Sequence, residues 1–163
     1  MVITGGEPTI WPDLETLITD IRALGYPVKL DTNGSNPDVL EDLIKRGLLD
    51  FVAMDFKTVF EKYRNATGSD VDIDDIKKSI DLILRSGLDY EFRTTAYPGA
   101  VTLNDLELMA AYLGERGAKG FVLQQYRPGK CLDPTAEEVR PYALEAMEDV
   151  TEKCRKYLPT KMR

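Results

Sequence analysis

Histidine is absent from this sequence of 163 residues. Without an imidazole, the chain cannot carry Ser-His-Asp or Cys-His catalysis, an HExxH zinc site or ordinary histidine-based acid–base chemistry. That exclusion is the firmest that the composition provides.

Cysteine is almost as scarce. The two cysteines, Cys131 and Cys154, lie in no CxxC pattern, so they cannot by themselves form a zinc or iron–sulfur site. We expect both to be free thiols, which fits a reducing, cytoplasmic location.

Long apolar runs and an excess of positive charge are missing too. No stretch approaches the roughly 18 apolar residues of a membrane span, and no signal-peptide pattern opens the chain, so we expect neither membrane insertion nor export. The chain carries 21 basic and 28 acidic residues, a net charge of −7. Because nucleic-acid binding needs a basic surface, we expect no nucleic-acid partner.

Short β-type runs alternate with apolar residues at helical spacing along the whole chain, and glycines follow the helical patterns. Strands are predicted near 2–4, 28–31, 51–55, 90–95 and 121–123, and helices at 14–24, 37–46, 73–86, 104–116 and about 135–157. Residues 57–70 are less regular. This alternation predicts an α/β fold with about five parallel strands, a partial barrel or an open sheet, in a single domain over 1–163.

Polar residues lie at the end of every predicted strand or just beyond it, where parallel α/β folds bind their ligands. These segments are Thr4-Gly5-Gly6-Glu7-Pro8, Asp31-Thr32-Asn33-Gly34, Asp55-Phe56-Lys57, Arg93-Thr94-Thr95 and Gln124-Gln125-Tyr126-Arg127. Each alone can be explained as a turn, a loop or a surface ion pair. Together, at one sheet edge, they favour a ligand site.

The side chains at this edge fit an amino acid joined to a nucleoside. Glu7 and the backbone of the double glycine can accept hydrogen bonds from an ammonium group, and Arg93 offers a planar fork to a carboxylate. Asp31 or Asn33 can meet a ribose diol. Asp55 and Lys57 share one face if their strand extends that far.

Several of these motifs resemble the radical S-adenosylmethionine superfamily, and within it the glycyl-radical-enzyme activating proteins. The stretches that carry the resemblance are Ile3-Thr4-Gly5-Gly6-Glu7-Pro8-Thr9, Lys29-Leu30-Asp31-Thr32-Asn33-Gly34, Val52-Ala53-Met54-Asp55-Phe56-Lys57 and Gln124-Gln125-Tyr126-Arg127-Pro128-Gly129, with Arg93 and Pro98-Gly99. They look most like the activating proteins of anaerobic ribonucleotide reductase. The resemblance covers nearly the whole chain.

The resemblance implies a set of cofactor contacts. Gly5, Gly6, Glu7 and Pro8 would meet the methionyl amino group of S-adenosylmethionine, while Asp55, Lys57 and Arg93 would line its carboxylate and ribose side, near Asp31 and Asn33. A monovalent cation would be held by Asp31, Thr32 and Asp55, with the carbonyl of Ala53. The family's chemistry is reductive cleavage of the sulfonium by a 4Fe-4S cluster, giving a 5'-deoxyadenosyl radical that abstracts a glycine hydrogen from a partner enzyme.

One family feature is missing from the sequence. The family holds its cluster with a CxxxCxxC loop that precedes the Gly-Gly-Glu-Pro segment, and this chain starts too late to contain it. We therefore expect a core truncated at its N-terminus, lacking the first βα unit of a six-stranded partial TIM barrel and inactive alone. The expected partners are a glycyl-radical enzyme and an electron donor. Self-association through the face bared by truncation is a further expectation.

Two alternatives stay open at this point. One is a metal-independent lyase barrel with Lys57 as a Schiff-base nucleophile. The other is a non-catalytic binding module. Among the remaining residues, Trp11 is expected to pack under the first loop, and the acids from Glu137 onwards are expected to form a solvated helix face.

Overall fold

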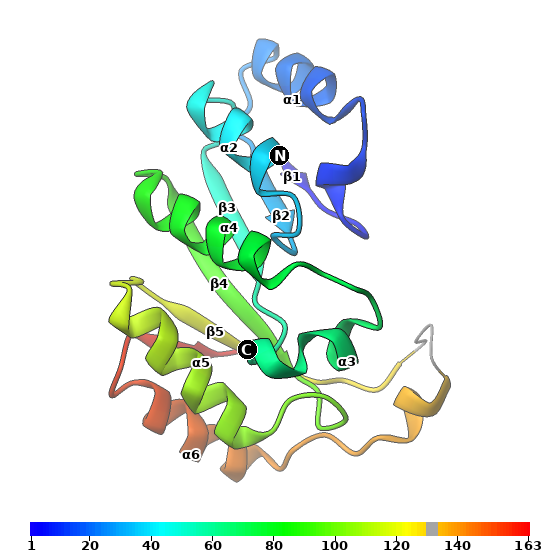
Figure 1. Cartoon of the computed structure of the whole chain (residues 1–163), viewed down its shortest axis with the longest axis vertical. Coiled ribbons are helices and arrows are strands. Elements are labelled where there is room, and N and C mark those ends of the chain that lie inside the picture. Colours follow the sequence, from blue (N-terminus) through cyan, green and yellow to red (C-terminus); the bar gives the residue numbers. More distant parts are fainter. Residues whose placement is uncertain (130–133) are drawn as a thin grey trace. The chain divides into compact units, whose positions relative to one another are not determined.

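A computed structural model describes residues 1–129 and 134–163 of the chain (Figure 1). Its strands are β1 (Val2–Ile3), β2 (Lys29–Thr32), β3 (Phe51–Asp55), β4 (Asp89–Ala96), β5 (Phe121–Gln125) and β6 (Thr160–Met162). Its α-helices are α1 (Leu14–Ala23), α2 (Pro37–Lys45), α3 (Tyr63–Thr67), α4 (Ile73–Arg85), α5 (Leu103–Glu115) and α6 (Leu144–Cys154). Short 3-10 helices lie at η1 (Pro8–Ile10), η2 (Phe60–Lys62) and η3 (Pro134–Glu138).

The strands follow one another in the sheet in chain order, from β1 to β6. The pairs β1–β2, β2–β3 and β5–β6 are parallel. This arrangement confirms the α/β class and the alternation of strands with helices. It also contains one strand more than the five that the sequence pattern predicts.

The chain divides into two compact units. The first consists of residues 1–56 and 71–92, and the second of residues 57–70 and 93–163.

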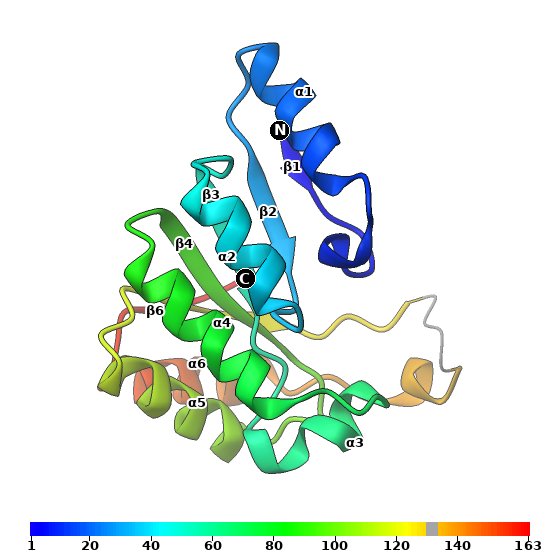
Figure 2. The same ribbon diagram turned by 45° about the horizontal axis from the view of Figure 1, so that its top comes forward.

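In the first unit, apolar side chains of β2 and β3 form the core with the helices. Leu30, Val52 and Met54 are fully buried, as are Ile18 on α1 and Ile80 on α4. Strand β2 alternates between half-buried and buried positions, because successive side chains of a strand point to opposite faces. Figure 2 shows α1, α2 and α4 along these strands. One face of β2 therefore belongs to the core, and the other carries Lys29 and Asp31.

The second unit is built around α5 and α6 and the β5–β6 pair. Gly114 of α5 lies against the backbone that follows α6, where an added Cβ would be 2.6 Å from the carbonyl oxygen of Tyr157. The Cys154 thiol of α6 donates to the carbonyl of Leu106 on α5. Strand β6 pairs with β5 from Phe121↔Thr160 to Leu123↔Met162. This last strand extends the sheet beyond the five predicted strands.

Two predictions about local structure are wrong. The predicted helix over about 135–157 is interrupted, because α6 begins only at Leu144 and η3 ends at Glu138. Pro141 lies in the break, where it has no amide hydrogen for a helical hydrogen bond. Trp11 does not pack under the first loop but is 68% exposed, since η1 buries Pro8 and Thr9 instead.

The structure also bears on membrane association. Among the residues it describes, no helix combines the length and the apolar character that crossing a bilayer requires.

Gly34 provides a test of the first unit's packing. Its φ of +76° favours glycine, and an added Cβ would lie 2.2 Å from Cε of Met54. Gly47 has a similar φ of +65° but open space around it. We expect Gly34→Ala to lower the free energy of unfolding by about 3 kcal/mol, because the alanine is both strained in the left-handed region and overpacked against Met54. Gly47→Ala should lower it by about 1 kcal/mol, because only the left-handed strain applies. Urea denaturation measures both, and equal losses would contradict the packing argument.

Candidate cofactor-binding site

The centre of the candidate site is the carboxylate of Glu7, in the loop after β1. Glu7 is buried, and it caps η1 by accepting a hydrogen bond from the Thr9 amide at 3.1 Å. The same oxygen, Oε1, accepts from the hydroxyls of Thr9 at 2.6 Å and Thr32 at 2.8 Å. The other oxygen, Oε2, accepts from the Asn33 amide at 2.5 Å. Glu7 thus ties the loop after β1 to the end of β2.

The loop after β2 is fixed by the same network. The Thr32 hydroxyl also accepts from the Gly34 amide at 3.1 Å, and the Asn33 side chain accepts from the Ser35 amide at 2.9 Å. Asn36 donates through Nδ2 to the Thr9 hydroxyl at 2.9 Å. The two loops that carry the Gly-Gly-Glu-Pro and Asp-Thr-Asn-Gly motifs are therefore held together.

The double glycine leaves its backbone accessible. Gly5 and Gly6 are exposed, and a Cβ at either position would have no heavy atom within 4 Å. Gly5 has a φ of +112°, which side-chain-bearing residues rarely adopt. A ligand can approach this backbone closely, as the sequence predicts for the amino group of S-adenosylmethionine. Four hydrogen bonds to Glu7 show, in addition, that its carboxylate serves the protein's own loops.

The remaining predicted residues of the first unit lie on β2 and β3. Asp31 is half-buried on the face of β2 opposite Thr32, with its Oδ1 3.7 Å from Nζ of Lys29. Asp55 is half-buried at the end of β3. The Thr32 hydroxyl donates to Glu7 and accepts from the Gly34 amide, which leaves one lone pair for a ligand. A cation site at Asp31, Thr32 and Asp55 stays a prediction.

Lys57 and Arg93 belong to the second unit. Lys57 is exposed, and its amide donates to the phenol oxygen of Tyr63 at 3.1 Å. Exposure does not favour the Schiff-base alternative, since lysine nucleophiles of that kind are activated by desolvation. Arg93 is half-buried on β4.

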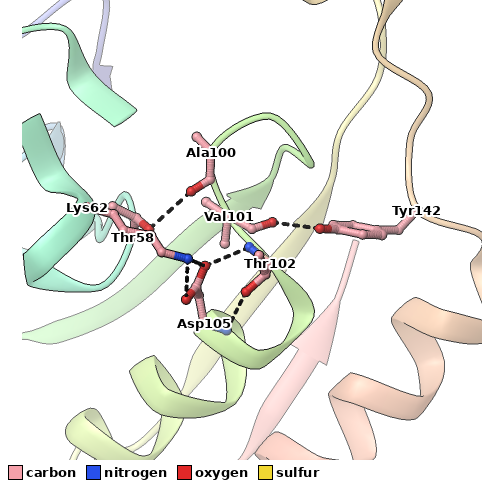
Figure 3. Close-up of polar contacts among 7 residues, drawn as sticks. All are labelled: Thr58, Lys62, Ala100, Val101, Thr102, Asp105 and Tyr142. Carbon is pink, nitrogen blue, oxygen red and sulfur yellow. Dashed lines mark hydrogen bonds and ion pairs between the residues drawn. The ribbon is translucent and has the colours of Figure 1, made fainter. Parts of the chain in front are cut away.

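In the second unit, an ion pair holds the loop between β4 and α5 (Figure 3). Nζ of Lys62 lies 2.9 and 2.7 Å from the two carboxylate oxygens of Asp105, which is buried and forms a capping box with Thr102. The hydroxyls of Thr58 and Tyr142 donate to the carbonyls of Ala100 and Val101. This loop follows the strand that carries Arg93.

The charge state of Asp105 follows from these contacts. Burial by itself raises the pKa of Asp105, but the hydrogen bonds from Lys62 and Thr102 outweigh it and hold the pKa below its usual value. The carboxylate is therefore ionised at neutral pH.

The described residues hold no ligand set for an iron–sulfur cluster. Within residues 1–129 and 134–163, no group of three histidine, cysteine, aspartate or glutamate side chains is arranged around a common point. Cys154 is buried, and burial raises the pKa of its thiol to about 12. Cys131 lies outside the described residues. The cluster therefore does not fit the side chains described here.

The comparison with protein families identifies the chain. The family model of the Radical SAM superfamily matches residues 1–113, which include both motif loops and Arg93. The chain belongs to the radical SAM superfamily. This membership confirms the resemblance seen in the sequence, and the superfamily uses S-adenosylmethionine with a 4Fe-4S cluster.

A curated relative points to a narrower group within the superfamily. A protein of Methanocaldococcus jannaschii that is named as a glycyl-radical enzyme activating enzyme is 37% identical over an alignment of 138 residues, and the match covers 82% of this chain. The matched part is 57% of that relative, so this chain spans little more than half of its length.

Solved structures show the same fold. A domain of the pyruvate-formate lyase-activating enzyme from Bacteroides vulgatus has a TM-score of 0.79 at 17% identity, covering 100% of this chain and 98% of that one. Streptococcus suis SuiB, bound to S-adenosylmethionine, has a TM-score of 0.73 at 16% identity, covering 99% of this chain and 39% of that one. These likenesses support the radical SAM partial barrel as the fold.

Sequence reasoning missed the residues that hold the site in place. Thr9 and Asn36 were not predicted, although Thr9 lies two positions after Glu7, where a backbone amide can donate to a capping side chain. Lys62 and Asp105 were missed as well, because they are far apart in the sequence. The Thr102 and Asp105 spacing of a capping box was a signal for one of them.

Thr32→Val tests the Glu7 network. The substitution keeps the shape but removes one donor to a buried carboxylate and one acceptor for the Gly34 amide. We expect a loss of about 1–3 kcal/mol in the free energy of unfolding, because buried polar groups lose their partners. Thr19→Val, which removes an exposed hydroxyl bonded to the Glu15 carbonyl, is the control and should cost less than about 0.5 kcal/mol. Chemical denaturation compares the two.

Asp105→Asn tests the ion pair through pH. Because the folded-state pKa of Asp105 is lowered, its stabilisation is complete above the unfolded value of about 3.9 and is lost as the pH falls through the lower folded value. We expect Asp105→Asn to destabilise the protein at pH 7, and the difference from the wild type to shrink below about pH 3.9. Thermal unfolding from pH 2 to pH 7 measures this. A pH-independent difference would contradict the ionised pair.

Proposed function

We propose that the chain is the S-adenosylmethionine-binding core of a glycyl-radical-enzyme activating enzyme, with anaerobic ribonucleotide reductase as the partner. The observation that carries the proposal is the Glu7 network, which holds the two motif loops together at the carboxyl ends of β1 and β2. Membership of the superfamily and the 37% identity to a protein named as an activating enzyme support it.

The roles of the site residues follow from their chemistry. The accessible backbone of Gly5 and Gly6 accepts from the methionyl amino group, and Asp31 and Asn33 bind the ribose. Lys57 and Arg93 supply positive charge for the carboxylate, and Arg93 can do so with two parallel hydrogen bonds. Glu7 orients the loops that present these groups.

A 4Fe-4S cluster needs cysteine ligands in addition to these cofactor contacts. In this superfamily a 4Fe-4S cluster would supply the electron for reductive cleavage of S-adenosylmethionine, and no described residue of this chain would hold it. Since the described residues offer no cysteine set for it, we propose that the chain by itself is inactive and that the cluster ligands come from residues outside this sequence.

The test uses two proteins prepared anaerobically with iron and sulfide: this chain, and a form extended upstream in the reading frame. Release of 5'-deoxyadenosine with dithionite is measured for each. We expect cluster formation and product from the extended form alone. If neither form holds iron or makes product, the radical reaction is contradicted, and borohydride trapping at Lys57 then tests the lyase alternative.

Variants of the active form test the site itself. We expect Arg93→Met to raise KM for S-adenosylmethionine about tenfold, because a charge-assisted contact to the carboxylate is lost. Arg85→Met, at the last residue of α4, is the matched control and should leave KM unchanged. An unchanged KM in Arg93→Met would contradict the carboxylate assignment.

A further inference from the structure

Lys29, the first residue of β2, lies between two carboxylates and an aromatic ring on the face of the sheet that carries Asp31. Its Nζ lies 3.3 Å from Oε1 of Glu91 on β4 and 3.7 Å from Oδ1 of Asp31. The ammonium group also lies 4.9 Å from the ring centroid of Phe51 on β3. One lysine thus contacts three strands of the first unit.

The register places this lysine directly behind Asp31. Lys29 pairs with Phe51 and Asp31 with Ala53, so Lys29 and Asp31 share a face, two residues apart along β2. Because two residues of a strand rise about 6.6 Å, Asp31 lies nearer to the carboxyl edge, and Lys29 reaches it from the opposite side. Lys29 can therefore orient Asp31 without occupying the edge where ligands bind.

The partial burial of Lys29, Asp31 and Glu91 strengthens the ion pairs between them. The side chains of Asp31 and Glu91 are 14% and 13% exposed, and that of Lys29 is 29% exposed. Ion pairs that water reaches poorly interact more strongly than surface pairs. The ring of Phe51 adds a favourable contact to the ammonium group. Lys29 also lies between two carboxylates of like charge, which repel each other less with a positive charge beside them.

We infer that Lys29 is a positioning residue for the cofactor site: it holds the carboxylate of Asp31, with Glu91 and Phe51 as its supports, in the orientation that binds the ribose of S-adenosylmethionine. The inference rests on the proposed function, since it needs Asp31 to contact the cofactor. In this role Lys29 acts through Asp31 and is not itself a cofactor contact.

The experiment measures the Kd for S-adenosylmethionine by calorimetry, and KM and kcat for 5'-deoxyadenosine release, in the reconstituted active form. We expect Lys29→Met to weaken binding about tenfold, the loss typical of removing a residue that orients a ligand-binding group. KM should rise while kcat changes little. Lys29→Arg, which keeps the positive charge, should restore most of the affinity.

Two comparisons separate positioning from a general loss of structure. Lys78→Met is the matched control, because Lys78 pairs with Asp38 at 2.6 Å on the exposed helical surface of the same unit, and it should bind as the wild type does. In an Asp31→Asn background, Lys29→Met should weaken binding no further. A residue that acts only through Asp31 has no further effect on the affinity once Asp31 is altered. Melting temperatures identify any variant that fails to fold.

The outcomes distinguish this inference from the proposed function. If the wild type does not bind S-adenosylmethionine, the proposed function fails and the role of Lys29 fails with it. If the wild type binds and Asp31→Asn weakens binding, but Lys29→Met does not, the role of Lys29 alone is overturned. Equal losses from Lys29→Met with and without Asp31→Asn would also overturn it.

Discussion

The first unit depends on how one buried negative charge is satisfied. The Glu7 carboxylate receives its described hydrogen bonds from uncharged donors, namely two hydroxyls and two amides. A buried carboxylate that lost these donors would be costly, so the loop after β1 and the loop after β2 must adopt their conformations together. The two loops are thus fixed by the protein's own contacts, and under the proposed function this reduces the entropy that cofactor binding has to offset.

Much of the fold could be predicted because its signals are local. Apolar residues at helical spacing and the glycines that follow them indicated α1, α2, α4 and α5. The sixth strand was not predicted because Thr160–Met162 is too short to show the alternation of buried and exposed side chains that marks a strand. The position of Trp11 was wrong for a related reason: a three-residue 3-10 turn decides which side chains face inward, and composition does not reveal its orientation.

The site was predictable as a set of motifs but not as a network. Polar residues at or after the ends of the strands mark the carboxyl edge of a parallel sheet, and this indicated Glu7, Asp31 and Asp55 as candidates. Their partners depend on contacts distant in sequence: Glu7 with Thr32, and Lys29 with Glu91. Such pairs are fixed by strand order and register, which a single sequence does not specify residue by residue.

The β5–β6 pairing determines where anything attached to the carboxyl terminus would emerge. The Arg163 carbonyl accepts from the Gln125 amide at 2.8 Å, and strand β6 runs parallel to β5. An affinity tag fused there would leave the protein at the carboxyl edge of β5, beside the kind of surface that binds ligands in this fold. A tag at Met1, which precedes β1, would leave from the amino edge of the first unit.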